Sequence, residues 1–175
     1  GNHAISQITR SEITKHGYGV CKAFVDGIRA IFGAEAADVY PAVMRFCRSL
    51  PLAIRFDNGV HVTHSLPSPN RMIYADPGIL DRSYEDEDLR RGGPAYEWTW
   101  GRNQTPEQLE GLAEELGVEF FLLGHRHIEM GSMVIPNRAL AINSDGPGGA
   151  IFEFHSDETI TLENASDHIK PIAEL

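Results

Sequence analysis

The sequence has 175 residues, of which 42% are apolar, enough for one domain with a substantial core. Asp and Glu outnumber Lys and Arg by 25 to 15, and the net charge of −10 argues against binding to nucleic acid, whose phosphates are held mainly by basic side chains. An anionic substrate would need local positive charge, from metal ions or from a few arginines. No apolar run has the length of a membrane span, no signal peptide is recognisable, and two cysteines are too few for a disulfide framework, so the expected location is the cytoplasm.

The first half of the chain predicts two helices followed by a hairpin. Apolar residues recur at helical spacing over residues 20–32, where Gly33 ends the pattern, and again over residues 38–50. Cys21 and Cys47 lie on the apolar faces of these two helices, and we expect both thiols to be buried. The period then changes, and residues 52–56 and 60–63 predict two strands joined by the turn Asp57-Asn58-Gly59.

The second half predicts one helix and several strands. Residues 67–102 contain prolines, glycines and an acidic run at 85–88, which is typical of a solvated, irregular region. Thr105-Pro106-Glu107-Gln108 has the N-cap, the first-turn proline and the capping-box glutamine of a helix that continues to Gly117. Residues 118–123 predict a strand buried on both faces, and shorter strands are expected at 139–143, 150–154 and 159–162. The expected fold is a single α/β domain over residues 1–175.

Three histidine-bearing junctions suggest a metal site. The strand at 118–123 runs through Gly124 into His125-Arg126-His127, and alternation in an extended backbone would put both imidazoles on one side. The strand at 60–63 runs into His64, and the chain opens with Asn2-His3 before a helix-forming segment. Each junction alone is weak, but together they favour a site for Zn, Mn or Fe, because imidazole and amide oxygen suit these ions.

The order of short sequence blocks carries a resemblance to a known family. The blocks are Gly1-Asn2-His3 with Gln7-Ile8-Thr9, Leu50-Pro51-Leu52 followed by "HSLPSP" from His64, Arg91-Gly92 with Trp98-Thr99-Trp100-Gly101, and Gly124-His125-Arg126-His127. In this order the chain resembles the calcineurin-like metallophosphoesterases, and most closely their serine/threonine protein phosphatase branch. The resemblance covers residues 1 to about 154.

The resemblance implies a fold, a metal centre and a catalytic set. The implied fold is part of an α/β/β/α sandwich, in which mixed sheets are flanked by helices. The chain would be the C-terminal portion of the catalytic domain, because the D-x-H and G-D-x-x-D blocks that precede G-N-H in the family are not in it. Two divalent ions (Mn, Fe or Zn) are implied, with Asn2, His64 and His125 on the second and His127 on the first. His3 would be the general acid and Arg91 a phosphate clamp, with Arg90 as a rival.

The implied activity is the hydrolysis of phosphate monoesters by a water that the metal ions activate. A phosphorylated protein is the first substrate class to consider, and small phosphate esters or dinucleotide polyphosphates are a second. Ala4 and Ser65-Leu66 depart from the family pattern, so a degenerate, non-catalytic binding domain is a further alternative. The chain by itself is expected to be inactive or nearly so, because the ligands of the first metal are not in it. The oligomeric state stays open.

Overall fold

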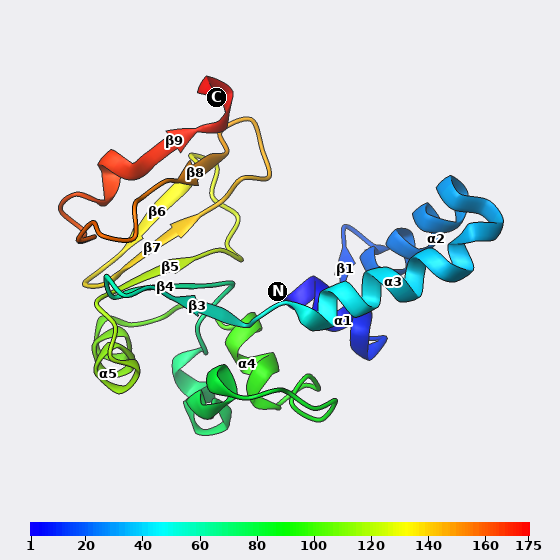
Figure 1. Ribbon diagram of the computed structural model, residues 1–175, viewed down its shortest axis with the longest axis horizontal. Helices are drawn as coiled ribbons and strands as arrows, with labels where there is room; N and C mark the ends of the chain where they lie inside the picture. The colour runs from blue at the N-terminus through cyan, green and yellow to red at the C-terminus, as the bar shows by residue number, and fades with distance from the viewer.

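The computed structural model describes all residues from Gly1 to Leu175. A body made of strands and the helices α4 and α5 lies on one side, and a long pair of helices extends from it on the other (Figure 1). The helices are α1 (Asn2–Thr9), α2 (Val20–Phe32), α3 (Ala36–Ser49), α4 (Pro94–Trp100) and α5 (Pro106–Leu116). The strands are β1 (Thr14–Lys15), β2 (Tyr18–Gly19), β3 (Ala53–Arg55), β4 (Val60–Thr63), β5 (Phe120–Leu123), β6 (Ser132–Ile135), β7 (Ala139–Ile142), β8 (Ala150–Phe152) and β9 (Ile169–Pro171). None of the helices is both long and apolar enough to cross a bilayer.

The main sheet has five strands in the order β3-β4-β5-β7-β6. Its central strands β4, β5 and β7 are parallel, whereas the edge strands β3 and β6 are antiparallel to their neighbours. The register pairs Thr63 with Leu123 and Leu123 with Ala141, so the three parallel strands end at the same edge of the sheet. The prediction of an α/β fold is confirmed, and this shared edge is where ligands bind in open α/β sheets.

The two faces of the sheet are covered differently. One face packs against α4 and α5 in a core that contains Trp98, Leu109 and Phe121, each almost fully buried. The other face carries Val60 and Phe120, which pack under the C-terminal segment with Ile160. This segment includes β8 and β9, which form a separate antiparallel pair. The strand β5 is therefore covered on both faces, which explains its nearly continuous apolar run and confirms the prediction of a strand buried on both sides.

Several predicted elements match the structure and several do not. The helix at 20–32 ends at Gly33 with a φ of 51°, and Thr105 caps α5 through a bond from the backbone N–H of Gln108, as expected. The second helix begins earlier, at Ala36. The region 67–102 contains the helix α4, and residues 159–162 are not a strand. Cys21 is buried, as predicted. Cys47 was also predicted to be buried but is only half-buried, because α3 packs loosely against the rest of the chain.

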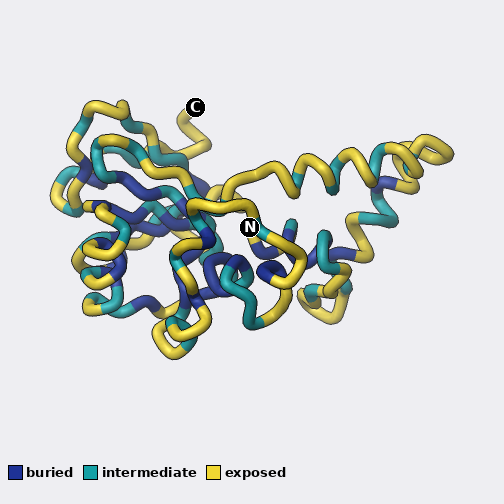
Figure 2. Tube along the Cα trace, turned by 60° about the horizontal axis from the view of Figure 1, so that its bottom comes forward, coloured by how far each residue is buried: buried dark blue, intermediate teal, exposed yellow.

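The helix pair α2–α3 exposes much of its apolar surface. Only Cys21 and Ile28 are buried on α2, and no residue of α3 is buried. Phe24, Ile31 and Phe46 are all exposed, and Figure 2 shows the pair largely in the colour of exposed residues. A hollow of about 640 Å³ lies between α1, α2 and α3. The helical periodicity of these segments is therefore real, but most of the apolar stripe has no partner within the chain.

His61 on β4 is a histidine without any hydrogen bond in the interior. The ring is fully buried, both ring nitrogens lack a partner, and Phe121 packs against it with ring centroids 5.5 Å apart. Burial, and to a lesser extent the charge of Arg55, lowers the pKa of His61 from 6.5 to about 4. The unfolded chain therefore binds a proton more readily than the folded chain between these two pH values.

We expect His61→Leu to make the fold less sensitive to acid. A histidine whose pKa is lowered on folding favours the folded state fully above pH 6.5, and this advantage is lost as the pH falls from 6.5 to about 4. The loss is worth roughly 3 kcal/mol of unfolding free energy, at about 1.4 kcal/mol per pKa unit. Urea unfolding at a series of pH values measures it, with the exposed His155→Leu as the matched control. Equal pH dependence in all three proteins would contradict this assignment.

Candidate metal centre

Two of the predicted histidines lie side by side because of the strand register. His64 directly follows β4, and Gly124-His125 directly follow β5, its parallel neighbour. The backbone N–H of Gly124 donates to the carbonyl of His64 at 3.2 Å, which continues the ladder one step beyond the strands. A side chain added at Gly124 would approach this carbonyl and the His64 ring, at 3.7 and 3.8 Å. The sheet therefore delivers both imidazoles to the same edge.

A third donor comes from the other end of the sequence. Asn2 lies in the first turn of α1 and is buried, and its side-chain oxygen Oδ1 is 2.9 Å from Nε2 of His64. The same His64 nitrogen is 3.0 Å from Nδ1 of His125. One amide oxygen and two ring nitrogens thus converge, although they are separated by about 60 residues in sequence. We call Asn2, His64 and His125 the donor cluster.

Ordinary hydrogen bonds do not account for both contacts. A neutral imidazole nitrogen has either one N–H or one lone pair, so Nε2 of His64 makes one conventional bond and not two. A divalent ion accounts for both contacts, because it accepts a lone pair from all three atoms. In an octahedral sphere, two metal–ligand bonds of about 2.1 Å at right angles hold their ligand atoms roughly 3.0 Å apart, against about 3.4 Å in a tetrahedral one. The observed separations of 2.9 and 3.0 Å match the octahedral spacing.

The electrostatics of the cluster favour neutral rings. Burial first, and then the charges of neighbouring basic groups, together lower the pKa of His64 to about 3. Burial also lowers the pKa of His125 to about 4, with the charge of Arg102 acting in the same direction. Both imidazoles are therefore unprotonated at neutral pH, which is the form that binds a metal ion.

The extended backbone that was expected to put His127 on the same side as His125 is not present. The extended backbone stops at Leu123, the N–H of Arg126 bonds back to the carbonyl of Gly124 at 2.8 Å, and His125 adopts a left-handed φ of 67°. The period of two therefore ends before the histidines, and His127 is exposed, 3.8 Å from a carboxylate oxygen of Asp145. A positive φ is uncommon for a residue other than glycine, although histidine adopts it more often than most residues do.

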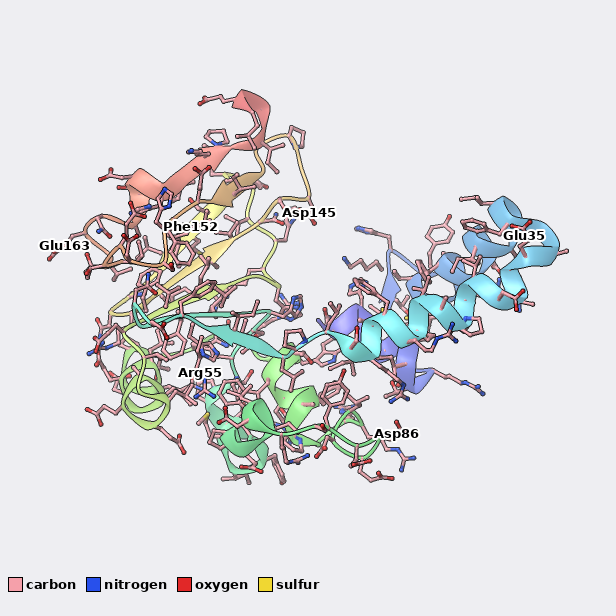
Figure 3. The ribbon with its side chains drawn as sticks, viewed as in Figure 1. Glu35, Arg55, Asp86, Asp145, Phe152 and Glu163 are labelled. Atoms are coloured by element: carbon pink, nitrogen blue, oxygen red, sulfur yellow. The ribbon has the colours of Figure 1, made fainter.

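A pocket of about 400 Å³ opens beside the donor cluster. His3 lies at its edge on α1, and desolvation and then the charge of Lys15 lower the pKa of its imidazole. Trp100 also lines it and packs edge-to-face on His125, with ring centroids 6.1 Å apart. The loop that carries Asp145 follows β7 on the side of the sheet that faces α1 (Figure 3). Six stretches from distant parts of the sequence therefore form its wall, at residues 2–3, 13–15, 64, 100–102, 125–126 and 143–145.

The structure does not bring Arg91 into this pocket. Arg91 is exposed in the turn before α4, and Arg90 is paired with Glu87 at 3.6 Å. The arginines that line the pocket are Arg102 and Arg126, neither of which was predicted to bind phosphate from the sequence. Arg126 lies between the two histidines of the G-H-x-H block, and Arg102 directly follows the Trp98–Gly101 block. Their positions next to these blocks could have indicated that both arginines lie near the site.

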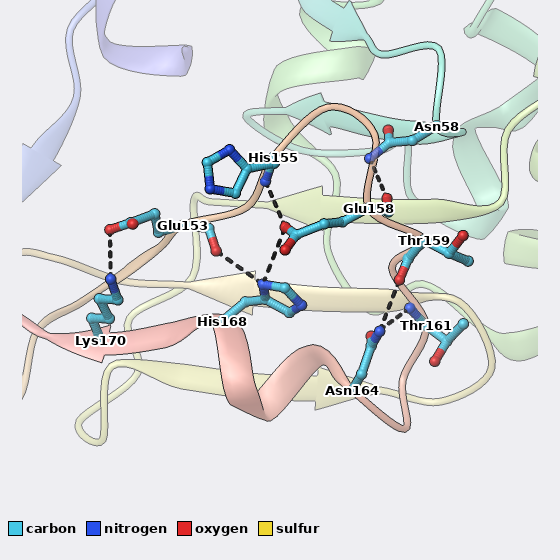
Figure 4. Close-up of polar contacts among 9 residues, drawn as sticks. All are labelled: Asn58, Glu153, His155, Glu158, Thr159, Thr161, Asn164, His168 and Lys170. Carbon is cyan, nitrogen blue, oxygen red and sulfur yellow. Dashed lines mark hydrogen bonds and ion pairs between the residues drawn. The ribbon is translucent and has the colours of Figure 1, made fainter.

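The donor set fits a borderline divalent ion. No group of three or more His, Cys, Asp or Glu side chains is arranged to hold a metal, so the third protein ligand would be the amide oxygen of Asn2. Two other histidines, His155 and His168, belong to a network of the C-terminal segment, where Nδ1–H of His168 donates to the carbonyl of Glu153 at 3.0 Å (Figure 4). The cluster leaves most of a coordination sphere open to water or substrate.

No protein-family model matches this chain, and a search of curated proteins finds no relative. The resemblance to metallophosphoesterases therefore rests on the sequence blocks alone. The structural feature relevant to it is the donor cluster.

Proposed function

We propose that the chain is the C-terminal portion of a metal-dependent phosphoesterase that hydrolyses phosphate monoesters, of the serine/threonine protein phosphatase type. The observation that carries this proposal is the convergence of Asn2 Oδ1, His64 Nε2 and His125 Nδ1 at the carboxyl edge of the sheet. These are the residues to which the resemblance assigns the second metal. A sandwich of two sheets is part of the same proposal, with β8 and β9 belonging to the second sheet.

The proposed reaction uses the three members of the donor cluster, His3 and Trp100. Asn2, His64 and His125 hold one divalent ion (Mn, Fe or Zn), and the ligands of a second ion come from the D-x-H and G-D-x-x-D blocks that the family carries before G-N-H. Paired metal ions supply Lewis acidity and activate the attacking water. His3, at the edge of the pocket, donates a proton to the leaving alkoxide as its bond to phosphorus breaks. Trp100 packs against the His125 ring and holds its orientation.

The direct test is hydrolysis of p-nitrophenyl phosphate by the full-length protein with each of Mn²⁺, Fe²⁺ and Zn²⁺, before and after chelation. Metal-dependent release of phosphate supports the proposal. Metal that is bound by the cluster without any hydrolysis would instead support the non-catalytic binding domain. A panel of phosphopeptides and small phosphate esters then separates the two substrate classes.

We expect His3→Gln to slow esters with poor leaving groups selectively. General-acid catalysis contributes on the order of 10²-fold when the leaving group is an alkoxide, and much less for p-nitrophenolate, which departs without a proton. The measurement is kcat for an alkyl phosphate against kcat for p-nitrophenyl phosphate in both proteins. Equal loss on the two esters would remove His3 from the role of proton donor.

A further inference from the structure

The pocket beside the donor cluster concentrates cations that have no acidic partner. Most basic side chains of this acidic protein form salt bridges, and those that form none are Arg10, Lys15, Arg45, Arg91, Arg102 and Arg126. Among these, Lys15, Arg102 and Arg126 line this one pocket. The only carboxylate in its wall is Asp145. A chain of net charge −10 thus leaves a positive site at the end of its sheet.

One of these cations is held in place by the fold. The guanidinium of Arg126 is half-buried and donates to the side-chain oxygen of Gln104 at 2.5 Å. Gln104 is itself buried, and its amide nitrogen donates to the carbonyl of Leu66 at 2.7 Å. Arg102 lies two residues before Gln104, with its backbone N–H bonded to Ser68 Oγ at 2.9 Å. The loop that contains both residues is therefore fixed to the segment that follows His64.

We infer that Lys15, Arg102 and Arg126 bind a second phosphate group of the substrate, next to the phosphate that is hydrolysed. This inference rests on the proposed function, in which metal ions hold the reacting phosphate. Arginine binds phosphate oxygens through paired N–H donors, and a pocket of about 400 Å³ has the size of a small-molecule site rather than of one phosphate group. The preferred substrate class is a small ester that carries two or more phosphates.

The distribution of charge favours a small anion over an acidic peptide. The cations line the pocket from three segments that converge there: Lys15 on β1 and Arg102 after α4, which are exposed, and Arg126 after β5, which is half-buried. The chain as a whole carries a net charge of −10. A phosphopeptide with acidic flanks would extend beyond these cations over a protein of net charge −10 and be repelled, whereas a compact bisphosphate would lie against the cations alone.

The test compares two sugar esters that differ by one phosphate, glucose 6-phosphate and glucose 1,6-bisphosphate, on the metal-loaded full-length protein. We expect kcat/KM to be roughly tenfold or more higher for the bisphosphate, the size of one charge-assisted hydrogen bond. Arg102→Ala should reduce this preference to about twofold or less. Arg45→Ala, an exposed arginine on α3 that also has no salt bridge, is the matched control and should keep the full preference.

A binding measurement separates this inference from the proposed function. In excess chelator, calorimetry should show that inorganic pyrophosphate binds more tightly than orthophosphate, and that Arg102→Ala removes the difference. If no ester is hydrolysed with any metal but this difference is found, the proposed function fails and the second phosphate site stands. If both esters are hydrolysed with equal kcat/KM, if Arg102→Ala slows both equally, or if acidic phosphopeptides are the Arg102-dependent substrates, the inference is overturned.

Discussion

Replacing His64 with alanine should abolish metal binding by the donor cluster and, in the full-length protein, phosphatase activity with it. Nε2 of His64 is the atom that lies within 3.0 Å of both other donors, so its removal leaves an amide oxygen and one imidazole that do not chelate an ion on their own. Mutating a residue that only hydrogen-bonds to a metal ligand typically lowers the metal affinity by about 10–100-fold. Removing the ligand itself should therefore lower the affinity by more than about 100-fold. Equilibrium dialysis with Zn²⁺ and Mn²⁺ measures this affinity, and His125→Ala should behave alike.

His155→Ala is the matched control for these two variants. His155 is exposed on the C-terminal segment, where its backbone N–H rather than its ring bonds to Glu158. The control should keep the affinity of the unmodified protein, and thermal unfolding should show that all the variants are folded. Unchanged metal affinity in folded His64→Ala or His125→Ala would reject the donor cluster as a metal centre and would remove the observation on which the proposed function depends.

The pairing of His64 with His125 could be expected from the sequence, because local patterns were sufficient there. His64 follows a strand that the preceding hairpin turn predicts, His125 follows an apolar run typical of a strand buried on both faces, and parallel strands end at one edge. Asn2 was harder to place, since no local signal links the start of the chain to the sheet. Its assignment came from the block resemblance, and the 2.9 Å contact with His64 shows that the fold brings it there.

The errors in the prediction have physical causes. The orientation of His127 depends on the φ of 67° at His125 and on the turn at Gly124, which no period reveals. The strand β9 forms only by pairing with β8 about 20 residues earlier, and its composition alone does not suggest a strand. Arg126 bonds to Gln104 in the loop that contains Arg102, and Gln104 bonds in turn to the loop after His64. These are tertiary contacts that no local pattern predicts. Site residues that lie in loops were therefore missed, whereas those at strand ends were found.

We expect Gly101→Ala to destabilise the fold by about 3 kcal/mol or more, because the new methyl group would meet backbone atoms. Gly101 is buried at the C-terminal end of α4 with an ordinary φ of −65°, so space and not conformation excludes a side chain. A Cβ there would lie 1.7 Å from the carbonyl oxygen of Leu66 and 2.6 Å from the backbone nitrogen of Ser68. The Oγ–H of Ser65 also donates to the Gly101 carbonyl at 2.5 Å. The loop that follows His64 would therefore have to move.

The same substitution tests how the site is supported. Displacing the loop should shift His64 away from Asn2 and His125, so the metal affinity of any folded Gly101→Ala protein should fall with its stability. Gly111→Ala is the matched control, since Gly111 is exposed within α5 with nothing within 4 Å of an added Cβ. Alanine there should raise the unfolding free energy by about 1 kcal/mol and leave the metal affinity unchanged. Urea unfolding gives both stabilities. Equal stability of the two variants would contradict the close approach of Gly101 to the His64 loop, and with it the view that α4 positions the donor cluster.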